Sequence, residues 1–385
     1  MRILYISSPS FADCDFPLIK EFYRQGYDVT YLINLTPYSL KSTLFNIKKQ
    51  LPINDIIPAS KYEELSVYAD YMDLSKTYII NRTSKKDSNI KNLKITQKLY
   101  SFIKKGNFDI IHSDIFFVFF DIILYSFKKK IVQTFHDPLV HTGEYSFKAK
   151  IFRTLAAKNA NKIILLNENQ RDAFSDAFGI DKKRIFINRL GIYNCIHTFN
   201  INKTVDTTKR NILFFGRISP YKGVEYLIEA MEIVHEKIPN SELIIAGGGK
   251  LYFDFSKYKD VDYIELINRY VGMEELAHLL YKSDVVVCPY TDATQSGVVM
   301  TAFAMNKPVV STNVGGMAES IKDNCNGLLV PPKDIKSLAC AIIKVLSDDT
   351  FVKRTAEFIN SEYCLGEKSW SFIVKEYINC YIAKI

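Results

Sequence analysis

Hydrophobic runs rich in β-branched residues alternate with amphipathic stretches along most of this chain. In the first half, such runs occupy residues 2–7, 27–33, 108–113, 130–137 and 161–167. Stretches between them, such as FPLIKEFYRQG, have the three-to-four-residue hydrophobic spacing of a helix. Strands that alternate with helices predict a parallel sheet covered by helices on both faces.

A polar segment separates this pattern from a second copy of it. Residues 191–209 lose hydrophobic periodicity, and we interpret them as a linker. The alternation then resumes, with runs at residues 211–216, 241–247, 261–267, 284–290, 307–313 and 326–332. We therefore predict an α/β protein in which two Rossmann-like domains, residues 1–190 and 210–365, face a central cleft. Ligands of such sheets bind beyond the carboxyl ends of the strands, so the residues after each strand carry the functional signal.

Two segments depart from the alternation. Residues 40–100 are polar and lysine-rich, and we expect helices and loops there. The most apolar window, residues 115–127, is shorter than the about 20 residues needed to cross a bilayer, and it contains Asp121. We expect a buried helix at this window rather than a membrane-inserted one.

The composition is that of an ordinary globular protein. The chain has 385 residues, 48% of them hydrophobic and 24% charged, which favours two domains. The seven cysteines are scattered without a CxxC pair, and the first residues lack the pattern of a signal peptide. We therefore expect free thiols and a reducing cytosol.

Positive charge is concentrated in the first half. Residues 1–195 carry 29 Lys and Arg against 19 Asp and Glu, whereas the remainder carries 21 against 23. An anionic lipid surface or an anionic lipid-linked substrate would complement the first half, and a solvated lysine-rich surface is an equally open interpretation. Nucleic acid is not an expected partner, because no binding motif or aromatic-basic stripe accompanies the charge.

The segment FFGRISPYKGVEYLIEAM places two cations just after a predicted strand. The strand ends at Gly216, Arg217 follows it, and Lys222 with Gly223 opens a predicted helix. A guanidinium fork, an ammonium group and a helix N-terminus together suit a diphosphate. Either cation taken alone is more typical of an ordinary charged surface.

The segment TDATQSGVVMTAFAMNKPVV follows another predicted strand. Asp292 is its only acid, and its small residues lead into a predicted helix. Such a loop can bind an anion through backbone N–H groups without any charged side chain. A strand–helix turn that binds nothing would have the same pattern.

In the first half, His136 lies just past a predicted strand, in QTFHDP. An imidazole there could hydrogen-bond a sugar hydroxyl, and a structural role is the alternative.

Two other features carry little signal. The run AGGGK at residues 246–250 does not match GxGxxG and is interpreted as a turn, and the DxD pairs at residues 13–15 and 260–262 are expected by chance. No metal site is indicated.

Taken together, these segments resemble the retaining family 4 glycosyltransferases of the GT-B fold (glycosyl transferases group 1). The resemblance rests on GRISPYKG, LIIAGGG, YVGMEELAHLLYKSDVVVCPY and TQSGVV…AFAMNKPVVSTNVGGMAESIKDNCNGLLVPP, in this order. It covers nearly the whole chain. The C-terminal KSWSFIVKEYINCYIAKI resembles the family's final helix, which implies that residues 366–385 pack back on the first domain.

The resemblance implies specific roles for residues in both domains. Arg217 and Lys222 would neutralise the donor diphosphate, and His136 would contact the donor sugar, which makes these three the predicted catalytic residues. The implied donor-binding residues are Gly216, Tyr270, Val271, Thr294, Gln295, Ser296, Gly297, Val298 and Thr301. The implied acceptor-side loop consists of Ser8, Pro9, Ser10 and Phe11.

The chain departs from the family pattern at two glutamates, which many members carry eight positions apart. Their positions fall on Ala293 or Thr294 and on Thr301. The second glutamate normally holds the ribose hydroxyls, for which a threonine would supply one weaker hydrogen bond. The sequence ATQSGV resembles a recurring variant within the family rather than random decay.

The implied activity is transfer of a sugar from a UDP-, GDP- or ADP-sugar to an acceptor hydroxyl, with retention and without a metal or other cofactor. The implied acceptor is a bacterial surface polysaccharide or lipid-linked glycan, and the protein would be cytoplasmic, peripheral at the inner face of the membrane. Domain closure around the donor is also expected. Two alternatives stay open: a nucleotide-sugar epimerase of similar two-domain form, and a catalytically silent glycan-binding or complex partner.

Overall fold

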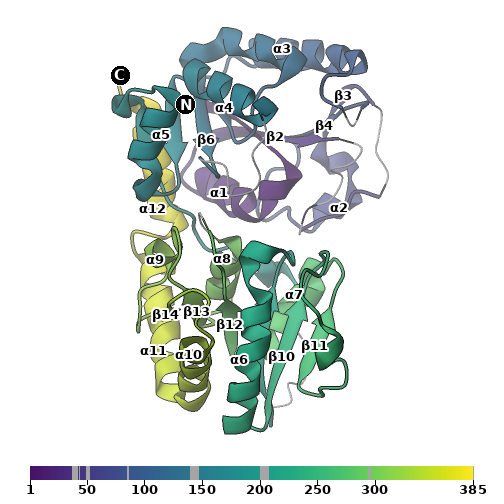
Figure 1. Cartoon of the computed structure of the whole chain (residues 1–385). Helices are drawn as coiled ribbons and strands as arrows, with labels where there is room; N and C mark the ends of the chain where they lie inside the picture. Colours follow the sequence, from purple (N-terminus) through teal and green to yellow (C-terminus); the bar gives the residue numbers. More distant parts are fainter. Residues whose placement is uncertain are drawn as a thin grey trace. The chain divides into compact units, whose positions relative to one another are not determined.

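The computed structural model describes residues 1–36, 42, 44–48, 53–84, 86–138, 147–199, 208–293 and 296–384. Two compact units make up the chain, and Figure 1 shows the elements of each. Unit 1 contains Met1–Leu190 and Trp370–Ile385, and unit 2 contains Gly191–Ser369. Of the predicted linker, residues 191–199 are described and contain the 3-10 helix η7 (Asn194–Thr198), whereas residues 200–207 lie outside the described part.

Unit 1 is built on an eight-stranded sheet with the order β3-β4-β2-β1-β5-β6-β7-β8. The strands are β1 (Arg2–Ser7), β2 (Asp28–Leu35), β3 (Asp55–Pro58), β4 (Thr77–Asn81), β5 (Ile110–Ser113), β6 (Ile131–Phe135), β7 (Lys162–Leu165) and β8 (Ile185–Ile187). All neighbours are parallel except β3 and β4. The chain runs from β1 to β2 on one side and later to β5 on the other. The carboxyl ends of β1 and β5 therefore form a switch point, where parallel sheets bind ligands.

The helices of unit 1 cover this sheet (Figure 1). They are α1 (Ala12–Arg24), α2 (Glu63–Ser66), α3 (Leu93–Gly106), α4 (Phe147–Asn159), α5 (Arg171–Phe178) and α12 (Trp370–Ile382). Short 3-10 helices include η1 (Pro9–Phe11) and a longer one, η4 (Phe119–Lys130). The sheet is buried on both faces, which is why its strands consist of nearly continuous hydrophobic runs.

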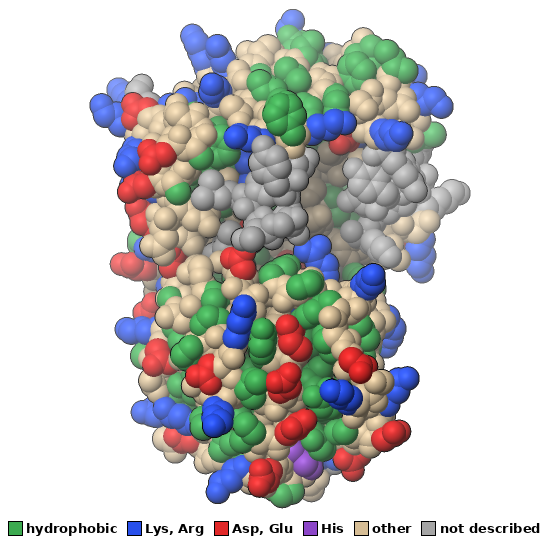
Figure 2. All heavy atoms as spheres, in the orientation of Figure 1, with side chains coloured by type: hydrophobic (Ala, Val, Ile, Leu, Met, Phe, Trp, Pro, Cys, Tyr) green, Lys and Arg blue, Asp and Glu red, His purple; other side chains and the backbone are tan. Residues whose placement is uncertain are grey.

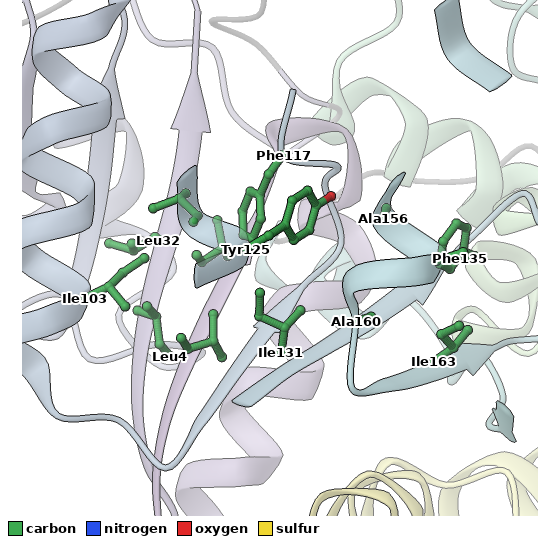
Figure 3. Close-up of a cluster of buried hydrophobic side chains, with 14 of the residues drawn as sticks. Leu4, Leu32, Ile103, Phe117, Tyr125, Ile131, Phe135, Ala156, Ala160 and Ile163 are labelled. Atoms are coloured by element: carbon green, nitrogen blue, oxygen red, sulfur yellow. The ribbon is translucent and has the colours of Figure 1, made fainter. Parts of the chain in front are cut away.

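One hydrophobic cluster lies between the sheet of unit 1 and the helices α3, η4, α4 and α5 (Figure 3). Leu4 and Leu32 enter it from β1 and β2, and Ile103 enters it from α3. In α3, buried apolar residues recur every four positions, so one face of the helix packs on the sheet while lysines remain on the other.

The C-terminal helix α12, yellow in Figure 1, is part of unit 1 and packs against α1. Phe22 of α1 contacts Tyr377 and Tyr381, with ring centroids 6.0 and 6.2 Å apart. The buried ammonium group of Lys162 donates to the carbonyl oxygens of Cys380 and Tyr381, at 2.7 and 2.8 Å. These bonds satisfy carbonyls that the last turn of a helix leaves without partners.

Unit 2 is built on a six-stranded, fully parallel sheet with the order β11-β10-β9-β12-β13-β14. The strands are β9 (Arg210–Phe215), β10 (Ser241–Ala246), β11 (Ile264–Ile267), β12 (Val285–Cys288), β13 (Val309–Thr312) and β14 (Gly327–Val330). The helices are α6 (Val224–Lys237), α7 (Met273–Lys282), α8 (Gly297–Ala304), α9 (Met317–Ser320), α10 (Ile335–Ser347) and α11 (Asp349–Ile359), which continues as a π-helical turn. Helices α6 and α10 lie side by side (Figure 1).

The expectation of only helices and loops at residues 40–100 was wrong, because β3 and β4 lie there. Strand β4 pairs in parallel with β2, and β3 adds an antiparallel edge. The strand β4 sequence TYIIN is a β-branched and aromatic run, so its signal was present in the sequence. Strand β3 has only four residues at a sheet edge, where fewer hydrophobic side chains are needed.

The window at residues 115–127 differs from the predicted buried helix in two ways. Its residues 119–127 belong to η4, which is a 3-10 helix, and the side chains of this helix are buried on only one face. Phe119, Ile122 and Ile123 are 38%, 38% and 54% exposed, whereas Asp121 is buried. Among the described residues, no helix combines the length and hydropathy needed to span a bilayer.

Candidate active site

Arg217 and Gly216 follow strand β9 in unit 2. Gly216 has a φ of +116°, and its N–H donates to Ala246 of β10, which turns the chain sharply at the strand end. Arg217 is exposed, and its Nη2 atom lies 3.5 Å from the hydroxyl oxygen of Tyr221. A guanidinium in this position can bind an oxyanion from solvent.

Lys222 is the last residue of the 3-10 helix η8 (Pro220–Lys222) and lies against the end of β12. The following residue, Gly223, has a φ of +62°, and a Cβ atom on it would lie 2.0 Å from the Pro289 carbonyl oxygen. The Nζ atom of Lys222 sits 3.7 Å from the ring centroid of the buried Tyr290. Only glycine permits this approach, so the backbone fixes the position of the lysine.

The ammonium group of Lys222 is held without a carboxylate ion pair among the described residues. Burial lowers the pKa of Lys222 to about 8, and repulsion from Arg217 contributes to the decrease. The ring of Tyr290 offers a cation–π contact, which is weaker than a carboxylate partner. An anionic ligand would therefore gain a strong pairing with a desolvated cation.

The N-terminus of α6 differs from the anion site that the sequence suggested beside Lys222. The N–H of Val224 donates to the hydroxyl oxygen of Tyr252 at 3.0 Å, and that hydroxyl donates to the Glu225 carboxylate at 2.5 Å. A protein hydroxyl and an acid therefore occupy this helix end. The N–H of Val224 is therefore not available to a diphosphate.

The TQSG segment leads into α8, and Gly297 and Val298 form its first turn. Ser296 is buried, and its hydroxyl lies 3.3 Å from that of Tyr290. A Cβ atom on Gly297 would lie 2.8 Å from the Tyr193 ring, and Val298 lies 3.6 Å from the Cβ position of Gly216. The ends of β9 and the start of α8 are thus in contact. Thr294 and Gln295 lie outside the described residues.

Thr301, at the position of the second family glutamate, is engaged inside α8. Its hydroxyl donates to the Gly297 carbonyl oxygen at 2.8 Å, and the residue is 5% exposed. Back-bonding of this kind is common for threonine within helices. In this conformation the hydroxyl has no proton left for a ribose oxygen.

Tyr270 and Val271, which the sequence suggested as base-facing residues, lie between β11 and α7. Tyr270 is 50% exposed. The glycine run approaches it closely, because a Cβ atom on Gly248 would lie 3.5 Å from the Tyr270 nitrogen. Gly249 donates its N–H to the Asn268 side chain at 3.0 Å. The run AGGGK is thus a close-packed turn.

His136 of unit 1 follows β6 and lies against the loop after β1. Its ring stacks on Phe11, with centroids 3.9 Å apart and planes 11° apart. Its Nε2 atom lies 3.5 Å from a carboxylate oxygen of Asp114, which follows β5. In the predicted acceptor-side loop, Ser10 is exposed, Ser8 is partly exposed and Pro9 is buried. Within unit 1, His136 and this loop therefore form one surface.

Behind His136 lies a buried polar network that the sequence did not reveal. Asp114 accepts a hydrogen bond from Tyr5 at 2.6 Å and lies 3.2 Å from Nε2 of His112. Nδ1 of His112 lies 2.8 Å from the hydroxyl of Tyr381 on α12. The partners are separated by 109 and 269 residues along the chain, so only the fold brings them together.

The network contains two carboxyl groups whose pKa values shift in opposite directions. Burial alone would raise the pKa of Asp114, but hydrogen bonds from His112 and His136 outweigh burial and hold it below its usual value. Burial, with repulsion from Asp114, raises the pKa of Asp15 well above its usual value. Asp114 is therefore the anion beside His136, and burial disfavours the ionised form of Asp15.

The DxD pair at residues 13–15 thus supplies Asp15 to this network, where it accepts a hydrogen bond from Tyr31 at 2.9 Å. Among the described residues, no three His, Cys, Asp or Glu side chains are grouped as a metal site would require.

Comparison with known proteins identifies the family. The family described as Glycosyltransferase Family 4 matches residues 18–193, and Glycosyl transferases group 1 matches residues 209–348. An uncharacterized glycosyltransferase of Methanocaldococcus jannaschii is 31% identical over 275 residues, which cover 65% of this chain and 68% of that protein. The chain belongs to this glycosyltransferase family, as its sequence motifs predicted.

The names of two further relatives state an enzymatic activity. The UDP-Gal:alpha-D-GlcNAc-diphosphoundecaprenol alpha-1,3-galactosyltransferase of Escherichia coli is 24% identical over 74% of this chain and 79% of its own length. The glycogen synthase of Mycobacterium tuberculosis is 26% identical over 56% of this chain, and the match spans about half (52%) of that relative.

Solved structures confirm the GT-B fold. Sucrose-phosphate synthase from Thermosynechococcus elongatus has a TM-score of 0.67 at 17% identity, covering 99% of this chain and 98% of that one. Anabaena HepE in complex with UDP and glucose has a TM-score of 0.68 at 16% identity, covering 98% and 99%. A Listeria monocytogenes protein assigned as a UDP-N-acetylglucosamine 2-epimerase reaches 0.62 at 14% identity, covering 98% and 95%. The fold alone therefore does not separate transferase from epimerase.

Proposed function

We propose that this protein is a retaining glycosyltransferase that moves a sugar from a nucleoside-diphosphate sugar to an acceptor hydroxyl. Lys222 carries the proposal, because its desolvated ammonium lacks a carboxylate partner among the described residues. Lys222 is partly buried. A lysine needed only for folding would be expected to have a carboxylate partner, since an unpaired desolvated charge costs stability. A diphosphate supplies the missing negative charge.

The reaction would depend on charge stabilisation at the leaving group. As the bond between the sugar and the diphosphate breaks, negative charge grows on the phosphate oxygen and positive charge on the sugar. Arg217 and Lys222 would stabilise the diphosphate, and the first turn of α8, at Gly297 and Val298, would add backbone N–H dipoles. His136, held by Asp114, would contact the donor sugar. In a front-face mechanism the leaving oxygen accepts the acceptor's proton, so no side-chain base is required.

Donor binding is tested by titrating UDP, GDP and ADP into the full chain by calorimetry. We expect one nucleotide to bind, to raise the melting temperature and to lose affinity in Lys222→Met. Lys353→Met, which removes an exposed lysine on α11, is the matched control and should bind as the wild type does. Absence of binding for all three nucleotides would refute the proposal.

Transfer is tested by supplying a nucleotide sugar with and without candidate acceptors. A transferase forms product only with an acceptor and otherwise shows slow hydrolysis, whereas an epimerase converts the donor without an acceptor. Anomeric NMR of the product decides between retention and inversion. Donor conversion that is independent of every acceptor would refute transferase activity.

We further propose a glycan or lipid-linked acceptor at an anionic membrane surface. The support is a set of exposed apolar side chains on η4 and α4, Phe119, Ile122, Ile123, Phe147 and Ile151. Exposed lysines neighbour them along the chain, at residues 128–130, 148 and 150. Figure 2 shows hydrophobic side chains beside Lys and Arg on the face of unit 1 that includes α3 and α4. Sedimentation with anionic vesicles should exceed that with neutral ones, and salt should weaken it.

A further inference from the structure

A cavity of about 250 Å³ opens in unit 1 at the carboxyl ends of β1, β2, β4 and β5. It therefore lies at the switch point of the sheet, between neighbouring parallel strands. Ser8, from the loop that also carries Phe11, forms part of its lining. The cavity, here termed the switch-point pocket, is smaller than the about 300–1,000 Å³ typical of drug-sized ligands, so it suits a ligand of one ring.

One wall of the switch-point pocket is a rigid polar array. The Arg82 side chain is 4% exposed, and its Nη2 atom donates to Asp121 at 2.5 Å while its Nε atom donates to Asn34 at 2.7 Å. Thr96 donates to the other oxygen of Asp121, also at 2.5 Å. Asp121 therefore neutralises the guanidinium and fixes its orientation. A ligand meets prearranged donors and acceptors rather than an unpaired cation.

Further polar groups remain for a ligand. The Thr36 hydroxyl is buried and makes no hydrogen bond to a described residue, although Thr36 lines the pocket. A buried hydroxyl without a partner costs free energy that a ligand hydroxyl would recover. Asp87 is partly buried in the same lining. Desolvation raises the pKa of Asp87 above its usual value. Because Asp121 already compensates Arg82, Asp87 in its ionised form gives the described lining a net negative charge.

The rest of the lining is apolar. Ile115, Phe116 and Val118 come from the loop after β5. The Phe116 ring packs on Phe135, with centroids 5.1 Å apart. Apolar side chains combined with amide, carboxylate and guanidinium groups match a sugar ring, which has C–H faces and a rim of hydroxyls.

We propose that the switch-point pocket binds a single uncharged sugar ring and discriminates against anionic rings. Its hydroxyls would bond to Asn34, Arg82 and Asp87, and its face would pack on Phe116. A carboxylate or phosphate on the ring would meet Asp87 at close range, where like charges repel. That this ring belongs to the acceptor rests on the proposed function.

The test uses probe pairs that differ only in charge, namely the methyl glycosides of glucose and glucuronic acid and those of galactose and galacturonic acid. Binding to the full chain is followed by saturation-transfer NMR, because a single ring binds in the millimolar range. In the wild type we expect at least one neutral probe to bind about tenfold more tightly than its anionic partner. Asp87→Asn should reduce that preference to about threefold or less, and Asp87→Lys should reverse it.

Asp70→Lys places the same charge change at an exposed site of unit 1 outside the pocket and should leave the preference unchanged. UDP binding, measured on the same samples, reports on unit 2, and circular dichroism with thermal melting of the full chain reports on the folding of unit 1. Selective loss of the preference with UDP binding intact supports the pocket. No binding of any neutral probe, equal binding of both members of each pair, or an unchanged preference in Asp87→Lys would overturn it. Failure of the wild type to bind UDP, GDP and ADP would refute the proposed function separately.

Discussion

Nucleotide affinity should fall as the pH rises from 7 to 9, because only the protonated form of Lys222 pairs with a diphosphate. Burial lowers the pKa of this lysine from 10.5 to about 8. About nine-tenths of the side chains are therefore charged at pH 7 and about one-tenth at pH 9. If only the charged form binds, the Kd for UDP rises about tenfold across this interval.

The neighbouring groups do not titrate in the same window. Burial raises the pKa of Cys288 to about 11, and burial also raises the pKa of Tyr290 well above its usual value. Arg217 stays charged throughout. The terminal phosphate of UDP has a second pKa near 6, so about nine-tenths of it is ionised at pH 7. The pH dependence of binding above pH 7 should therefore report mainly Lys222.

Calorimetry in buffers of different ionisation enthalpy measures both the affinity and the proton uptake. We expect about half a proton to be taken up per UDP at pH 8 and nearly one at pH 9. Lys222→Arg, which stays charged, should bind with a flat pH profile, whereas Arg217→Lys should retain the wild-type slope. Intact wild-type binding that does not change between pH 7 and 9, without proton uptake, would refute this reasoning.

Three further outcomes are expected. Folding lowers the pKa of Lys222, so the unfolded chain binds this proton more tightly than the folded one does. Lys222→Met should therefore raise the free energy of unfolding at pH 7 by about 1–2 kcal/mol, and this gain should disappear above about pH 10.5. An unchanged melting temperature would contradict this. Arg217→Ala and Lys222→Ala should each lower turnover about 100-fold, as loss of one charge-stabilising group does, and wild-type rates in both would refute their role. Gly223→Ala should destabilise unit 2 and weaken UDP binding. The control Gly26→Ala has the same positive φ, but its Cβ meets no atom within 4 Å, so it should cost only about 1 kcal/mol of backbone strain. Equal melting temperatures for the two variants would show that the Pro289 contact is unimportant.

The hydrophobic runs predicted the central strands of both sheets, because a parallel strand buried on both faces must be apolar along its length. Strands β1 and β9, for example, lie where RILYIS and NILFFG indicated. The same reasoning failed at the edge of unit 1, where β3 is short and has few buried side chains. It also failed at η4, whose Asp121 is buried to meet Arg82 while Ile123 is exposed.

The positions of Arg217 and Lys222 could be anticipated, because they follow a strand within one local segment. The contacts and the burial of these two side chains could not be anticipated. The pairing of Arg82 with Asp121 spans 39 residues, and that of His112 with Tyr381 spans 269. Hydrophobic periodicity carries no information on such pairs. The free end of α6 was misjudged for the same reason, since Tyr252, which caps it, lies 28 residues beyond Val224.

The return of α12 to unit 1 has a consequence for biosynthesis. Unit 2 is, in chain order, an insertion within unit 1, because residues 191–369 separate the first part of unit 1 from its last helix. During translation unit 2 is complete before unit 1 is. Until Trp370–Ile382 leaves the ribosome, Phe22, Lys162 and His112 lack the partners that cover them. Unit 1 therefore stays incomplete for longer than unit 2 and is exposed to chaperones and proteases during that time. A stop codon just before Trp370 would leave unit 1 without its last helix, whereas unit 2 could still fold.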